Sequence, residues 1–114
     1  MEDISHTNLL PYQSSWNDEF LAEEKRLQEI FGDKAVAIEH IGSTAVEGLS
    51  AKPIIDIAVL IENDEDADSF TNSLSEIGYK YDKEKSSSER HFFRKGEPTE
   101  FHLSIAYKNK GGFW

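Results

Sequence analysis

Apolar side chains recur in the N-terminal part of the chain at the spacing of one helix face. Asp18 and Glu19 fall in the first turn of this pattern, where the helix dipole favours acidic side chains. Gly32-Asp33 ends the pattern. It predicts a helix from about Ser14-Ser15 to residue 31, after a polar arm over residues 1–14. The stripe that carries the prediction consists of Trp16, Phe20, Leu27, Ile30 and Phe31.

Short apolar runs farther along the chain predict strands. The strongest run is Ile54–Ile61, which is apolar apart from Asp56 and is typical of a strand covered on both faces. Ala35–Ile41 is a second, weaker run. Three more short strands are predicted at residues 79–82, 90–95 and 100–107.

A second helix is predicted between the strands, beginning at Asn63-Asp64-Glu65 and closed by Gly78. This order of elements predicts an α/β or α+β fold, with a short mixed sheet flanked by helices. The 114 residues fit a single domain, 1–114. Five aromatic side chains are expected in its core: Trp16, Phe20, Phe70, Phe93 and Phe101.

Composition excludes several classes of protein. The net charge of −10 opposes non-specific binding to a phosphate backbone. No apolar run has the roughly 20 residues that a membrane span needs, and no signal peptide is visible. The chain has no cysteine, so disulfides and thiolate metal sites are excluded. By default, a cytoplasmic location is expected.

The charge is unevenly distributed along the chain. Residues 1–78 carry 4 basic and 17 acidic side chains, whereas residues 79–114 carry 8 basic and 5 acidic ones. A basic C-terminal third could hold an anionic ligand. The alternative, which we favour on charge alone, is a solvated hairpin whose lysines protect an edge strand.

The segment that carries chemistry runs from His40 to Asp56. His40-Ile41-Gly42-Ser43-Thr44 follows a strand, and its Gly-Ser turn and following helix start predict a phosphate cradle. Ser43 could instead simply cap that helix. Lys52 could neutralise a phosphate or be a solvated loop residue. Asp56 could bind Mg²⁺ together with a phosphate, or form a buried salt bridge with Lys52, Arg90 or Arg94.

Polar side chains also share one face of the two C-terminal strands. Arg90 and Arg94 lie four residues apart with Phe92 between them on the same face, and arginine suits both phosphate binding and stacking. If the two strands pair, His102 and Ser104 can approach the same pocket. The alternative is ordinary polarity at the edge of a sheet.

The stretch IEHIGSTAVEGLSAKPIIDIAVLI, Ile38–Ile61, resembles the signature of the GrpB (UPF0157) family, and Arg90–Lys95 and Phe101–Ser104 resemble its later motifs. The resemblance covers roughly residues 10–114. It implies a nucleotidyltransferase-like fold. Family members continue with C-terminal helices, so the chain is expected to lack an element that would cover Phe113-Trp114. Glu47 stands where the family usually has proline, and Ser104 where a second histidine is usual.

The resemblance leads to two hypotheses about function. In the first, the protein binds a nucleotide or another phosphorylated small molecule and transfers a nucleotidyl or phosphoryl group with Mg²⁺. Asp56 and His102 would be catalytic, and Asp56 would hold the metal. In the second, a non-catalytic module senses the nucleotide or anion, because Ala58 stands where active nucleotidyltransferases have a second carboxylate. Glu39 or Glu100 close to Asp56 would favour catalysis. The expected phosphate-binding residues are His40, Gly42, Ser43, Thr44, Lys52, Arg90 and Arg94.

Overall fold

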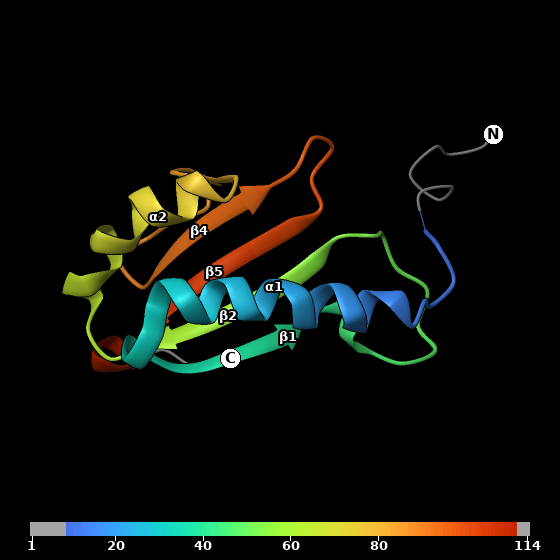
Figure 1. The fold of residues 1–114 in the computed structure, drawn as a ribbon, viewed down its shortest axis with the longest axis horizontal. Coiled ribbons are helices and arrows are strands. Elements are labelled where there is room, and N and C mark those ends of the chain that lie inside the picture. Colours follow the sequence, from blue (N-terminus) through green and yellow to red (C-terminus); the bar gives the residue numbers. More distant parts are fainter. Residues whose placement is uncertain (1–8, 112–114) are drawn as a thin grey trace.

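A mixed β-sheet forms the centre of the molecule (Figure 1). The structure is a computed structural model, and it describes residues 9–111. Within that range the sheet has five strands in the order β1-β2-β5-β4-β3. The strand β2 pairs with β5 in parallel, and the other neighbours are antiparallel. The bounds are β1 (Ala35–Ile41), β2 (Ile55–Ile61), β3 (Tyr79–Tyr81), β4 (Arg90–Lys95) and β5 (Phe101–Tyr107).

Two α-helices accompany the sheet, α1 (Ser15–Phe31) and α2 (Thr71–Glu76). The long helix α1 lies across β1 and β2 in Figure 1. Its buried side chains are four of the five residues of the predicted stripe and one that the pattern did not predict, Glu23; Ile30 is half-buried. The predicted α+β architecture is confirmed. All five aromatic residues expected in the core lie in one buried cluster with side chains of β2 and β5.

The two faces of the sheet have different surroundings. Alternate residues of β2, such as Ile57 and Val59, belong to the core under the helices. The intervening residues Asp56 and Ala58 point to the opposite face, together with His102 of β5. We call this second face the open face, because α1 and α2 of the described chain both pack on the first. The run predicted a strand covered on both faces; on the open face Ala58 is buried, whereas Asp56 and Leu60 are half-buried, so only the helix side of β2 is completely covered.

The second predicted helix is largely a 3₁₀-helix. Asp64–Phe70 forms this tighter helix, and only Thr71–Glu76 is α-helical. Aspartate and serine side chains compete with the backbone for hydrogen bonds, which weakens an α-helix. Here Ser69 Oγ donates to the Asp66 carbonyl, and Asn109 Oδ1 accepts from the Asp64 backbone N–H at 3.1 Å.

The segment after β1 also differs from its prediction. Ser43–Ala45 is a single 3₁₀ turn whose N-cap position is occupied by Gly42, without a side-chain capping hydrogen bond. The predicted cap at Ser43 is wrong, and a three-residue turn has too few aligned peptides for the helix-dipole cradle that the sequence suggested.

Part of the predicted N-terminal arm packs against the rest of the chain. Leu10 forms a two-way backbone bridge with Ala51, with N···O distances of 2.8 and 2.9 Å, so this part of the predicted arm is tied to the loop before β2. Phe113-Trp114 and the first eight residues lie outside the described residues. Among the residues described, no helix is long and apolar enough to cross a membrane.

Candidate functional site

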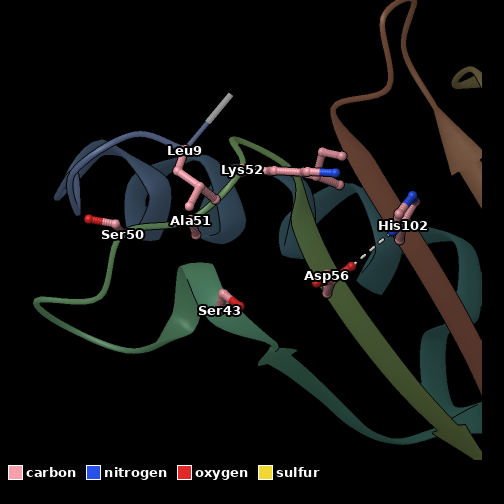
Figure 2. A pocket seen from close by; sticks show the side chains of 8 residues that line it. Leu9, Ser43, Ser50, Ala51, Lys52, Asp56 and His102 are labelled. Carbon is pink, nitrogen blue, oxygen red and sulfur yellow. Dashed lines mark hydrogen bonds and ion pairs between the residues drawn. The ribbon is translucent and has the colours of Figure 1, made fainter. Parts of the chain in front are cut away.

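A pocket of about 330 Å³ lies where β2 and β5 begin (Figure 2). We call it the Asp56–His102 pocket after the two ionisable residues that the sheet contributes. Its polar side chains come from three places: the turn after β1, the loop before β2, and the two strands. The lining residues are Leu9, Ser43, Ser50, Ala51, Lys52, Ile54, Asp56 and His102.

Asp56 and His102 are joined by a hydrogen bond, with 3.0 Å between Oδ1 and Nδ1. Parallel pairing places the two residues directly opposite each other on the open face, so the register of β2 and β5 fixes the contact. Their side chains are 34% and 29% exposed, which leaves both accessible from the pocket. The alternative that the sequence left open, a salt bridge to Lys52, Arg90 or Arg94, is not observed. The partner is His102.

This hydrogen bond has a chemical consequence for the imidazole. When the ring is neutral, a carboxylate that accepts from Nδ1–H leaves the lone pair on Nε2. Within residues 9–111, Nε2 of His102 has no hydrogen-bond partner. Asp56 thus holds the ring in one orientation and leaves its second nitrogen for a proton, a metal ion or a ligand.

The Asp56 carboxylate also packs closely against Gly42. Its φ of 78° lies in the left-handed region, where glycine has no Cβ penalty. A β carbon at this position would overlap Asp56 Oδ2. Gly42 therefore contributes close backbone packing rather than a side-chain ligand, and Ser43, the next residue, enters the pocket lining.

Lys52 supplies a positive charge to the pocket from the loop before β2. The loop is held in place on either side, by the backbone bridge between Leu10 and Ala51 and by the start of β2. Among the described residues Lys52 forms no ion pair. Of the predicted site residues, the structure thus brings Ser43, Lys52, Asp56 and His102 together around one pocket.

His40 and Thr44 do not join this group. The His40 ring stacks on Phe20 of α1, with centroids 5.0 Å apart, on the helix-covered face. Its Nε2 lies 2.9 Å from Thr44 Oγ1, which in turn lies 3.4 Å from the Ile54 carbonyl oxygen. Burial lowers the pKa of His40, and the nearby Asp56 carboxylate only partly opposes that effect. Neither residue lines the pocket, so their predicted role in phosphate binding becomes a structural role.

The two arginines lie on the open face but differ in their partners. Arg94 lies beside His102 in the register of β4 and β5, and its guanidinium forms an ion pair with Asp82. That guanidinium holds the pKa of the Asp82 carboxyl below its usual value. Arg90 forms no ion pair within the described residues; its guanidinium carbon lies 4.9 Å from the Phe92 ring centroid. Neither arginine lines the pocket.

The donor set does not fit a paired-metal centre. In the range 9–111, no group of three or more His, Asp or Glu residues converges as a metal site would require. Glu39 pairs in register with Ala58 rather than with Asp56. Glu100 lines a different cavity, on the side of α1. Neither carboxylate therefore joins Asp56 and His102 in a group of metal ligands within the described residues, which two-metal chemistry would need.

A second polar cluster was missed in the sequence. Glu23 is completely buried, and its carboxylate accepts from the Tyr79 hydroxyl at 2.7 Å and from Lys95 and Arg26 at 2.8 Å each. Burial and the adjacent carboxylate raise the pKa of Tyr79. The signal was available, because Glu23 lies three residues after Phe20 and four before Leu27, inside the apolar stripe.

Comparison with known proteins gives a consistent set of relatives. A family model described as GrpB protein matches residues 6–114. A UPF0157 protein of Halalkalibacterium halodurans is 36% identical over 100 residues, which are 88% of this chain and 51% of that protein. A UPF0157 protein of Pseudomonas aeruginosa is 38% identical, over 84% of this chain and 40% of the relative. The chain thus spans about half or less of the length of these relatives.

Two further matches extend this picture. The crystal structure of conserved protein GrpB from Enterococcus faecalis superposes with a TM-score of 0.84 and 36% identity, over 90% of this chain and 63% of that one. A dephospho-CoA kinase of Mycobacterium tuberculosis is 40% identical over 74 residues, which are 62% of this chain and 18% of the kinase.

Proposed function

The chain belongs to the GrpB family, and from that premise we propose that its Asp56–His102 pocket binds a small phosphorylated ligand, a nucleotide or a phosphorylated metabolite. The observation that carries the proposal is the oriented Asp56–His102 pair in a pocket that Ser43 and Lys52 also line. Lysine is a common binder of phosphate as a point charge, and a serine hydroxyl can donate to a phosphate oxygen.

The roles of the residues follow from their positions. Lys52 neutralises phosphate charge at the mouth of the pocket, and Ser43 donates from the turn after β1. His102 presents Nε2 to the ligand while Asp56 fixes Nδ1. In this position His102 can donate a hydrogen bond to a phosphate oxygen when protonated, or accept a proton when neutral.

The kinase match supports the same ligand class. The name of that relative says that it acts on dephospho-CoA, a phosphorylated nucleotide derivative. The similar segment makes up 18% of the kinase. We therefore infer from this match only the class of ligand, because a related segment occurs in a protein that acts on a phosphorylated nucleotide derivative.

Magnesium enters the proposal only together with the ligand. Mg²⁺ in proteins is often held by one or two carboxylates plus the phosphates of a substrate. Asp56 is the carboxylate that would meet such an ion here. Because the described residues do not fit a pair of metals, we favour the binding module over nucleotidyl transfer, and a nucleotidyltransferase-like activity stays a prediction.

The test is thermal denaturation with inorganic phosphate, ribose 5-phosphate and AMP, each with and without Mg²⁺. A ligand at 100 times its Kd stabilises a protein by about 2.7 kcal/mol, or roughly 10 °C at this size. The shift should disappear in Lys52→Met and persist in Lys83→Met, an exposed lysine of the loop between β3 and β4. Asp56→Asn should remove a Mg²⁺-dependent part of the shift and reduce the remainder, because it also removes the carboxylate that orients His102. The absence of a shift with all three phosphates would overturn the proposal.

A further inference from the structure

The open face carries a second group of side chains next to the pocket. Phe92 of β4 lies in register with Ser104 of β5, two residues from the pair formed by Arg94 and His102. The Phe92 and His102 rings are in contact, with centroids 5.2 Å apart. The polar pocket and the Phe92 ring are therefore continuous across β5 and β4.

Two cationic side chains lie over the Phe92 ring, and Arg90 is the nearer. The Arg90 guanidinium carbon lies 4.9 Å from the ring centroid, and the Lys85 ammonium lies 6.0 Å from it. Arg90 Nε donates to the Lys85 carbonyl at 3.2 Å, and one terminal nitrogen lies 3.4 Å from Ser104 Oγ. These contacts hold the guanidinium group against the Phe92 ring. Phe92 is only 7% exposed, whereas Arg90 is exposed.

The charge of Arg90 is not neutralised by its surroundings. Arg26, Arg94 and Lys95 each have a carboxylate partner, but within the described residues no carboxylate lies at ion-pair distance from Arg90. A guanidinium that rests on an aromatic ring presents its other flat face outward. Such a face stacks well on planar, electron-rich rings, including nucleobases.

We propose that the ligand of the Asp56–His102 pocket is a nucleotide whose base stacks on the outer face of the Arg90 guanidinium, above Phe92. This inference rests on the proposed function, because it assumes that the phosphate lies at Lys52 and Ser43. The ligand then extends from the pocket past His102 over β4. The subsite recognises a planar aromatic ring and leaves the identity of the base to other contacts.

The experiment measures Kd by calorimetry for ribose 5-phosphate and for AMP, GMP, CMP and UMP, with the full chain. If the base stacks, each nucleotide binds about 5-fold to 100-fold more tightly than ribose 5-phosphate. Arg90→Lys keeps the charge but removes the planar face. It should bring the nucleotides close to ribose 5-phosphate in affinity and leave ribose 5-phosphate itself unchanged.

The control variant exchanges another arginine that lies away from the open face. Arg26→Lys makes the same exchange on the helix-covered side and should leave the ratio of affinities unchanged. Equal binding of nucleotides and ribose 5-phosphate would overturn the inference while the proposed function stands. An equal loss for both ligand types in Arg90→Lys would overturn it as well, because Arg90 would then bind the phosphate. If no phosphate binds at all, the proposed function fails too.

Discussion

The carboxylate of Asp56 fills the space that a β carbon on Gly42 would occupy. An ideal Cβ on Gly42 would overlap Oδ2 and lie 3.1 Å from Cγ and 3.2 Å from Cβ of Asp56. Oδ1 of the same carboxylate bonds to His102. The glycine turn, the carboxylate and the imidazole therefore form one packed unit, and a change at the turn reaches the pocket through Asp56.

We expect Gly42→Ala to lower the free energy of unfolding by about 2 kcal/mol or more, because the left-handed φ of 78° costs a non-glycine residue about 1–2 kcal/mol and the overlap adds to it. Gly48→Ala is the matched control. Gly48 has a φ of 85°, with no atom within 4 Å of an ideal Cβ. Denaturant unfolding should show a clearly larger loss for Gly42→Ala; equal losses would contradict the steric role of Asp56.

The contact between Asp56 and His102 predicts a tautomer. With its ring neutral, His102 should carry its proton on Nδ1, because the Asp56 carboxylate accepts there. Long-range ¹H–¹⁵N NMR at alkaline pH reports which nitrogen is protonated. In Asp56→Ala, the His102 signals should move toward the Nε2–H form, which is ordinarily preferred in water. His40, which bonds to Thr44 instead, should keep its tautomer. An unchanged His102 tautomer would mean that Asp56 does not orient the ring.

His40 predicts a pH dependence of stability. Its pKa in the folded protein lies below the ordinary value of 6.5, chiefly because burial disfavours the charged ring. Below pH 6.5 the unfolded chain binds the proton more readily than the folded one, so stability falls as the pH is lowered through that value. We expect His40→Gln to gain stability relative to the original chain between pH 7.5 and pH 5. A difference between the two proteins that stays constant over this range would refute the prediction.

Glu23 is the test of the buried cluster. We expect Glu23→Ala to lower the free energy of unfolding by about 3 kcal/mol, because it leaves the Tyr79 hydroxyl and the Lys95 ammonium without their acceptor. Glu29→Ala removes a carboxylate from an exposed position of the same helix and should change stability by less than about 0.5 kcal/mol. Urea unfolding measures the free energy of unfolding of both variants. Similar small losses would show that the Glu23 cluster contributes little to stability.

The pocket illustrates how far local sequence could lead. The spacing around Gly42 and the isolated Asp56 in an apolar strand identified a polar site, and the structure places Ser43, Lys52, Asp56 and His102 around one pocket. The sequence-based alternative named Lys52, Arg90 or Arg94 as the partner of Asp56, whereas the structure shows His102. Asp56 and His102 are 46 positions apart in the sequence and are brought together by the parallel register of β2 and β5, which no local pattern encodes.

His40 and Arg94 were predicted at the site from their positions in the sequence, and packing places both outside the pocket lining. In β1, Ile41 lies in register with Asp56, and His40 lies in register with Ile57. Because side chains alternate along a strand, His40 points to the helix-covered face, opposite to Asp56. Arg94 does lie on the open face, but its guanidinium forms an ion pair with Asp82. Side-chain alternation was predictable in principle, whereas the ion pair depends on how β3 and its following loop lie against β4.

By itself, the sequence determined the type and approximate bounds of most elements, the core aromatics and the family, because apolar periodicity and a long contiguous motif are local properties. The Asp56–His102 hydrogen bond and the acceptor role of buried Glu23 were decided only by the tertiary structure. Each joins elements that are distant in sequence and meet only in the folded protein, where burial and register choose the partners.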